Sequence, residues 1–144
     1  MQPNNKVIDD LIISNDKLKL DVELIHKFLT TSYWAEGRKI AEVKNSIEHS
    51  ICFGVYKDDK QIGFARILTD YSVIAFLMDV FILEEYRGKG FSKLLLKRIL
   101  EDERFKRIKK WRLATKDAHS LYAQFGFEKI KNPDRLMEKV VLRK

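Results

Sequence analysis

The amino-acid sequence predicts a mixed α/β fold, in which about four helices flank a mixed central sheet of about six to seven strands. Two observations predict it. The expected strands and helices follow one another in an order that neither alternates strictly nor separates into two blocks. Hydrophobic residues make up 45% of the 144 residues, which is enough for the core of one domain of ordinary size. We therefore expect residues 1–144 to form a single domain.

The first half of the chain is expected to form a strand, two helices and a hairpin. Residues 11–13 are apolar and open a short strand. Asp21 is the expected N-cap of a helix, because apolar residues follow it at helical spacing. A connector over residues 30–37 leads to a second amphipathic helix over about residues 40–47. Two strands then flank residues 57–60, whose polar character predicts a hairpin turn.

The second half is expected to add a long strand, two helices and several shorter strands. The long strand runs over about residues 73–83, and an amphipathic helix follows over about residues 91–102. A later helix is expected to be capped by Asp117 and ended by Gly126. The other expected strands cover residues 111–115, 127–130 and 136–142.

The charge of the chain suits an anionic partner. The formal net charge is +7, which by itself does not choose between a nucleic acid and a phosphorylated cofactor. The densest basic run, residues 104–112, joins a helix end to a strand start, where cations are favourable for dipole reasons alone. No recognition-helix pattern or stacked aromatic strand motif is found, so we predict no nucleic-acid partner.

The sequence predicts a cytoplasmic protein without a membrane partner. Its one cysteine, Cys52, excludes an intramolecular disulfide and lies in an apolar strand, where an inert core thiol is expected. Residues 1–5 lack the apolar core of a signal peptide. The longest apolar run is interrupted by Asp79 and is too short to span a bilayer.

A basic glycine loop lies between the long strand and the helix that follows it. Gly88 and Gly90 allow the main chain to approach a ligand without a β-carbon in the way. The first amides of the helix lack internal partners and lie at the positive end of its dipole. Arg87, Lys89 and Lys93 add formal charge at the same place. A strand, glycine loop and helix in this order can hold a phosphate group on backbone amides.

The pattern of this loop separates it from two better-known phosphate loops. A dinucleotide loop needs a third glycine where Lys93 stands, and the nucleotide triphosphate pattern G-x-x-x-x-G-K-[ST] is absent. Residues 87–92 instead resemble R-x-x-G-x-G/A, the pyrophosphate loop of the GNAT superfamily of N-acetyltransferases, which use acyl-coenzyme A. Ser92 stands where Gly or Ala is usual, and its small size should be tolerated. The alternative interpretation is an ordinary basic loop before a helix.

A second segment, residues 118–127, is similar to the A-x-x-L-Y-x-x-x-G-F pattern of the same superfamily. Because the expected element order also matches, the resemblance covers nearly the whole chain and implies the GNAT fold, with acetyl-coenzyme A as co-substrate. It further implies that the pantetheine arm bonds to the main chain at the strand end, as an added strand would. The implied coenzyme-binding residues are Val80, Phe81, Ile82, Arg87, Gly88, Lys89, Gly90, Phe91, Ser92, Lys93 and Asp117.

Tyr122 and Asp79 are the candidate catalytic residues. Tyr122 matches the family tyrosine that lies near the thioester sulfur. Full proton transfer from a phenol to the leaving thiolate is unfavourable by roughly 2 kcal/mol, whereas a hydrogen bond to the sulfur helps without complete transfer. Tyr122 is therefore expected to stabilise the leaving thiolate or to protonate it as a general acid. The alternative is a tyrosine that fills the core. Asp79 interrupts an apolar strand and is either the general base or a structural hydrogen-bonding group.

The acceptor is expected to be a primary amine of a small molecule or peptide. In the superfamily the connector between the first two helices shapes the acceptor pocket. Its aromatic rings could clamp an amine by cation–π contact, or equally form a hydrophobic plug. A glutamate there would supply a counter-charge, and an arginine would suit an anionic group on the substrate. The implied acceptor residues are Tyr33, Trp34, Glu36, Arg38 and Phe76.

Three further expectations concern ligands and partners. The three histidines lack metal-ligand spacing and the aspartates form no cation loop, so we predict no metal. The strand expected over residues 136–142 offers an edge through which a homodimer could form. The alternative function is a non-catalytic module that binds acyl-coenzyme A and acts as a sensor.

Overall fold

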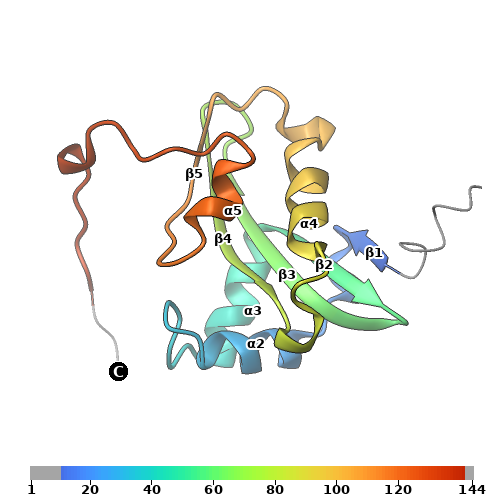
Figure 1. The fold of residues 1–144 in the computed structure, drawn as a ribbon. Helices are drawn as coiled ribbons and strands as arrows, with labels where there is room; N and C mark the ends of the chain where they lie inside the picture. Colours follow the sequence, from blue (N-terminus) through green and yellow to red (C-terminus); the bar gives the residue numbers. More distant parts are fainter. Residues whose placement is uncertain (1–10, 142–144) are drawn as a thin grey trace, which may run out of the picture.

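A computed structural model describes residues 11–141 of the chain and gives them a mixed sheet covered by helices (Figure 1). The described sheet has five strands in the order β1-β2-β3-β4-β5. Neighbouring strands are antiparallel from β1 to β4, and β5 is parallel to β4. The strand bounds are β1 Leu11–Ser14, β2 Ile51–Lys57, β3 Lys60–Thr69, β4 Ile74–Ile82 and β5 Lys110–Arg112.

Four α-helices cover the two faces of this sheet, as Figure 1 shows. One hydrophobic cluster joins helices α4 and α5 to one face and includes Leu95, Leu96, Ile99 and Tyr122. A second cluster joins α2 and α3 to the other face and includes Ile25, Leu29, Val43 and Ile47. The helix bounds are α2 Val22–Thr30, α3 Ile40–Glu48, α4 Phe91–Leu100 and α5 His119–Ala123.

Local sequence signals explain several of these boundaries. The Asp21 side chain accepts a hydrogen bond from the Leu24 amide at 3.1 Å, so Asp21 caps α2 as predicted. The hairpin between β2 and β3 turns at Asp58 and Asp59, whose φ angles are 53° and 66°. A tight turn of this kind needs positive φ, which aspartate tolerates better than most residues.

The pairing of β3 with β4 is irregular near the end of β4. Phe64 of β3 pairs with Phe81, whereas Arg66 pairs with Met78, so Asp79 and Val80 together face one residue of β3. Asp79 has a φ of 55°, which turns the backbone at this bulge. The bulge changes which β4 residues face α2 and α3, and it brings the Asp79 carboxylate to the Arg66 side chain.

The sequence overstated the number of strands. No strand forms after β5 within the described residues, so the expected strand over residues 127–130 is wrong. The same holds for residues 136–141 of the expected strand over 136–142, while its last residue lies outside the described range. The physical reason is that a strand needs a neighbour to satisfy its backbone groups. Within the described chain these residues have none.

No helix among residues 11–141 is long and apolar enough to cross a membrane. No group of three or more histidine, cysteine, aspartate or glutamate side chains in that range could hold a metal ion. The prediction that the protein uses no metal remains a prediction.

Candidate active site

The glycine loop adopts a backbone shape that only glycine takes without strain. Gly88 and Gly90 have φ angles of 79° and 84°. A β-carbon built on either glycine would meet no atom within 4 Å, so the space above the loop is open. These glycines are therefore needed for the conformation of the chain, while the open space beside them is available to a ligand.

Helix α4 begins directly after this loop and leaves its first amides unpaired. Gly90 is the N-cap and offers no side chain to cap the helix. The first helical hydrogen bond runs from the Leu94 amide to the Gly90 carbonyl at 3.2 Å. The amides of residues 91–93 precede that bond and have no partner among the described residues. These amides form the positive end of the helix dipole, where an anion is bound favourably.

A hollow of about 220 Å³ lies at this helix start. It contains most of the predicted loop residues and also Leu121, which precedes Tyr122 on α5. Four other predicted coenzyme residues do not line it: Val80, Phe81, Lys89 and Asp117. The lining residues are Ile82, Tyr86, Arg87, Gly88, Gly90, Phe91, Ser92, Lys93 and Leu121.

Arg87 anchors the loop to the strand that precedes it. Its Nε donates a hydrogen bond to the Ile82 carbonyl at 2.8 Å. The guanidinium is thereby held at the junction of β4 and the loop, where its charge faces the hollow that it lines. Lys93 also lines the hollow and is exposed, so a second cation is available without being fixed in place.

The edge of β4 beside this hollow lacks a strand partner. The β4–β5 ladder contains only three pairs and ends at Phe76 and Arg112. Beyond Phe76, residues 77–82 of β4 face no described strand on the β5 side. Backbone groups on such an edge can bond to an extended ligand, whatever the side chains are. The side chains of Val80 and Phe81 can therefore pack into the two core clusters while their main chain stays available.

Tyr122 lies on the short helix α5 and is only 8% exposed. Its ring contacts Phe127 edge-on, with ring centroids 5.8 Å apart. Burial, with a smaller contribution from Tyr33, raises the pKa of Tyr122 to about 12. The hydroxyl has no hydrogen-bond partner among the described residues, so the phenol remains a protonated donor that another group can use.

The start and the end of α5 differ in how well the sequence predicted them. Asp117 is exposed and does not cap the helix, so that prediction is wrong: the N-cap is Ala118. The Ala118 amide instead bonds to the Thr115 hydroxyl at 3.0 Å, because that side chain already reaches the helix start. The helix was expected to end at Gly126, but it ends at Ala123, and Gly126, with a φ of 90°, closes the turn that follows. There the Phe127 amide bonds back to the Tyr122 carbonyl.

Asp79 is buried in a cluster of hydrogen-bond donors. One carboxylate oxygen accepts from Arg66 Nε and Arg38 Nη1, both at 2.8 Å, and the other accepts from Trp34 Nε1 at 2.9 Å. Burial alone would raise the pKa of Asp79, but the hydrogen bond from Arg66 and the charges of both arginines hold it below its usual value. These contacts favour the structural alternative. A carboxylate with a lowered pKa, whose two oxygens already accept three hydrogen bonds, has little affinity for a further proton.

The Asp79 cluster also places the connector between α2 and α3. Trp34 and Arg38 both bond to Asp79, although they lie more than forty residues away in the sequence. Tyr33 contacts Trp34 edge-on at 5.1 Å and accepts a hydrogen bond from the Lys116 amide at 3.0 Å. The connector is therefore fixed to β4 on one side and to the loop before α5 on the other.

The aromatic residues of the connector do not form a buried plug. Tyr33 is 54% exposed and Trp34 is 39% exposed, whereas the residue buried here is Ala35. The Lys116 ammonium already lies 5.3 Å from the centre of the Tyr33 ring. Phe76, on the neighbouring part of β4, is 40% exposed, and Glu36 is exposed as well. The predicted acceptor residues thus remain accessible, and none of them lines either of the two hollows described in this section.

Sequence reasoning missed Arg66, which is buried and completes the Asp79 cluster. It donates to the Ser50 hydroxyl at 3.0 Å as well as to Asp79. Its place within the otherwise apolar residues 62–67 could have indicated that Arg66 is buried. A buried arginine needs an acidic partner, so an ion pair could have been predicted. The sequence does not indicate which acid it meets.

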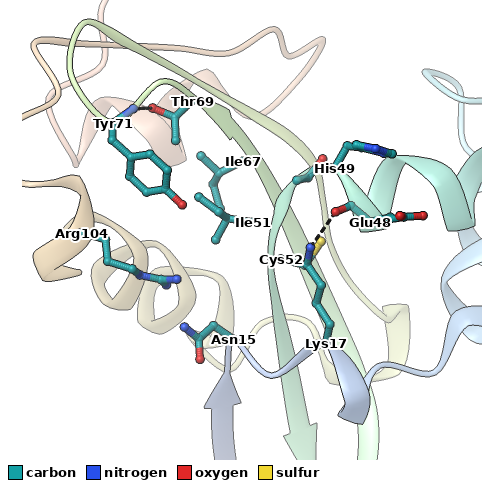
Figure 2. A pocket seen from close by; sticks show the side chains of 11 residues that line it. Asn15, Lys17, Glu48, His49, Ile51, Cys52, Ile67, Thr69, Tyr71 and Arg104 are labelled. Atoms are coloured by element: carbon teal, nitrogen blue, oxygen red, sulfur yellow. Dashed lines mark hydrogen bonds between the residues drawn. The ribbon is translucent and has the colours of Figure 1, made fainter.

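A larger hollow, of about 420 Å³, lies between the ends of β2 and β3 and elements η1 (Lys17–Lys19) and η3 (Glu103–Phe105) (Figure 2). Lys17 and Arg104, which line it, already have partners within the protein. Lys17 donates a hydrogen bond to the Glu48 carbonyl, and Arg104 forms an ion pair with Asp102. Cys52 also lines it, but burial raises the pKa of that thiol to about 11. This hollow therefore offers neither a free cation nor a reactive thiolate.

The chain matches a known family over more than half of its length. Residues 48–129 match the family described as "Acetyltransferase (GNAT) domain". This range contains the glycine loop, Asp79 and Tyr122.

Individual relatives agree with this match. A GNAT-family protein from Xanthomonas campestris, known from a crystal structure, is 41% identical, with a TM-score of 0.88 over 91% of this chain and 93% of that one. A protein of Porphyra purpurea named "Uncharacterized N-acetyltransferase ycf52" is 29% identical, over 88% of this chain and 74% of its own length. A protein of Gibberella zeae whose name assigns it to the acetyltransferases is 27% identical over 66% of this chain, which spans 65% of that protein's length. The chain therefore belongs to the GNAT acetyltransferase family.

Proposed function

We propose that the protein transfers an acetyl group from acetyl-coenzyme A to a primary amine of a small molecule or peptide. The observation that carries this proposal is the hollow at the start of α4, formed by Gly88, Gly90 and the amides of residues 91–93, beside the unpaired edge of β4. Family membership supports the same assignment.

The coenzyme is assigned to two adjoining surfaces. The diphosphate lies in the hollow, where the amides of residues 91–93 donate to its oxygens and Arg87 and Lys93 supply charge. The pantetheine arm lies along residues 80–82 and bonds to their main chain. This division explains why the loop is basic while the strand end is apolar. Asp117 is exposed on the loop before α5 and is assigned only a peripheral coenzyme contact.

The proposed reaction is a direct transfer. The neutral amine nitrogen forms a bond to the thioester carbonyl carbon, the carbon–sulfur bond breaks, and its electron pair passes to the sulfur. The surplus proton on nitrogen leaves to water or to a base. Asp79 is not assigned as that base, because Arg38, Arg66 and Trp34 already use its oxygens.

Tyr122 is assigned as the group that stabilises the leaving thiolate. With a phenol pKa of about 12, complete proton transfer to a thiolate with a conjugate-acid pKa near 8.5 is uphill by about 5 kcal/mol. A hydrogen bond that strengthens as charge develops on the sulfur avoids this cost. Tyr122 therefore acts as a donor that keeps its proton through most of the step.

The acceptor is assigned to the surface between the connector and β4. Trp34 and Arg38 are held there by Asp79, with Phe76 exposed on the strand and Tyr33 and Glu36 exposed on the connector. A fixed, partly exposed arginine suits an acceptor amine that also carries an anionic group.

Release of free coenzyme A thiol from acetyl-coenzyme A, measured with a panel of amines, tests the proposal. We expect amine-dependent release above the rate of spontaneous hydrolysis. The panel should include amino acids, polyamines and lysine peptides, each with and without a carboxylate. Binding of acetyl-coenzyme A without release for any amine of the panel would contradict transfer and favour the sensor alternative.

A further inference from the structure

The last described part of the chain stands away from the body of the protein. Every residue from 128 to 141, here called the C-terminal arm, is exposed. Figure 1 shows the arm leaving α5 and running away from the sheet. Four of its apolar side chains are open to solvent by half or more: Leu136 52%, Met137 94%, Val140 66% and Val141 55%. Such a run of exposed apolar residues marks an interaction surface.

The arm makes no hydrogen bond to the rest of the described chain. Its two backbone bonds are internal and close the short turn η4 (Pro133–Arg135): Arg135 to Asn132 at 3.0 Å, and Leu136 to Pro133 at 3.1 Å. Beyond this turn the backbone groups of residues 137–141 have no protein partner in the described range. An extended apolar segment with free backbone groups can pair with the open edge of a sheet.

The same chain offers such an edge at β5. Strand β5 is last in the sheet order and pairs only with β4, so its outer side is unpaired among the described residues. The edge is not shielded by a bulge or a proline within Lys110–Arg112. One chain therefore carries both an unpaired strand and an unpaired edge.

Arg112 on this edge lacks a partner that its burial requires. Its Nε is buried and has no acceptor among the described residues. Arg112 pairs with Phe76 of β4 on one side only, so its other side faces the open edge of the sheet. An added strand at the β5 edge would lie directly beside Arg112 and would bring hydrogen-bond acceptors close to the guanidinium.

We propose that two copies of this chain exchange their C-terminal arms, each arm adding a strand to the β5 edge of the other copy. A two-fold arrangement gives each arm a strand edge and each β5 edge an arm, so the assembly is complete at two copies. A stiff stretch of backbone at Asn132 and Pro133 precedes the apolar part of the arm. Proline fixes its own φ and disfavours a helical residue before it, and Asn132 has φ −127° and ψ 74°.

Sedimentation of the full chain at micromolar concentration, without acetyl-coenzyme A, is the first test. We expect twice the mass of one chain. The double variant Leu136→Asp, Val140→Asp should sediment as a monomer, because it places charges on the apolar side chains of the arm. Leu18→Asp is the matched control, since Leu18 is 95% exposed on η1, outside the arm, and this variant should remain dimeric. A monomeric wild-type chain, or a double variant that stays dimeric, would overturn the proposal.

Energy transfer between labelled chains distinguishes arm exchange from other dimers. One preparation carries a donor dye at Met137→Cys and the other an acceptor dye at Lys110→Cys; both positions are exposed, whereas Cys52 is buried and should not label. After the two are unfolded and refolded together, we expect strong transfer that an excess of unlabelled chain abolishes. A dimer without transfer would overturn arm exchange. Because neither readout uses the coenzyme, both remain interpretable if the proposed acetyl transfer fails.

Discussion

The coenzyme loop and the acceptor connector of this protein are built in different ways. The loop, residues 87–93, is contiguous in sequence and presents backbone amides around open space. The connector between α2 and α3 is positioned by side chains that reach a buried carboxylate on a distant strand. The difference indicates that changes at the loop should alter ligand affinity with little effect on folding. Changes at the Asp79 cluster should alter folding first.

The largest expected effect is on stability, at Asp79. The variant Asp79→Asn removes the anion between Arg38 and Arg66 and leaves the buried Arg66 without a counter-charge. We expect the free energy of unfolding in urea to fall by about 3 kcal/mol at pH 7. Affinity for acetyl-coenzyme A should change little in the fraction that stays folded. If Asp79→Asn left the free energy of unfolding unchanged, the Asp79 cluster would not differ from the loop in its importance for folding.

The same variant should also change how stability depends on pH. The pKa of Asp79 is lower in the folded chain than its unfolded value near 3.9, so its contribution to stability is present above that pH. The contribution is lost as the pH falls toward the folded pKa. The wild-type chain should therefore lose more stability than Asp79→Asn between pH 5 and about pH 3. Asp102, whose pKa is also lowered, titrates in both proteins, and the difference between them isolates Asp79.

The next largest effect is on catalysis, at Tyr122. Loss of the hydroxyl in Tyr122→Phe removes a donor to the leaving sulfur, and a turnover about 10²-fold lower is expected. The dissociation constant for acetyl-coenzyme A, measured by calorimetry, should stay within about twofold, a shift well under the 1.4 kcal/mol that a tenfold change represents. Tyr71→Phe is the matched control, because Tyr71 is 43% exposed and lines the other hollow. Equal turnover of the two variants would leave Tyr122 as a core residue only.

A smaller effect is expected at Arg87. The variant Arg87→Gln removes one charge at the hollow and the bond to the Ile82 carbonyl, so affinity for acetyl-coenzyme A should fall about tenfold, or 1.4 kcal/mol. The affinity of the variant should also depend less on salt. Arg107→Gln changes the net charge equally at an exposed site outside the loop and should bind as the wild type does. Similar losses in both variants would point to bulk charge and not to the loop.

The smallest effects come from two matched glycines. Gly90 and Gly37 have φ angles of 84° and 79°, and a β-carbon on either meets nothing within 4 Å. Alanine at each should cost about 1 kcal/mol of stability through backbone strain. Gly90→Ala should weaken acetyl-coenzyme A binding, whereas Gly37→Ala should leave it intact and raise the KM for the amine. If both variants changed the affinity for acetyl-coenzyme A and the KM for the amine in the same way, the loop and the connector would not bind different ligands.

The contiguous features were predictable from the sequence. The long strand, the glycine loop and the helix after it were predicted close to their observed positions, because periodicity and glycine chemistry act within a few residues. The capping of α2 by Asp21 and the turn that Gly126 closes after α5 followed from local hydrogen bonding in the same way.

The contacts that position the acceptor residues could not be predicted from the sequence, because the residues that form them lie far apart in the chain. Asp79 was recognisable as a charge in an apolar strand, but its bonds to Arg66, Arg38 and Trp34 span 13, 41 and 45 residues. The last strands were expected from their apolar residues, and that reasoning failed for a different reason. A strand depends on a neighbour, and the sequence of one chain does not state whether the neighbour belongs to the same copy.

Backbone amide chemical shifts, followed while acetyl-coenzyme A is added to the isotope-labelled protein, show directly whether the coenzyme binds at the glycine loop. We expect the largest shift changes at Gly88, Gly90 and residues 91–93, followed by residues 80–82. We expect little change around the hollow of Figure 2, at Lys17, His49 and Arg104. Shifts concentrated at that second hollow, with the glycine loop unchanged, would contradict binding at the loop.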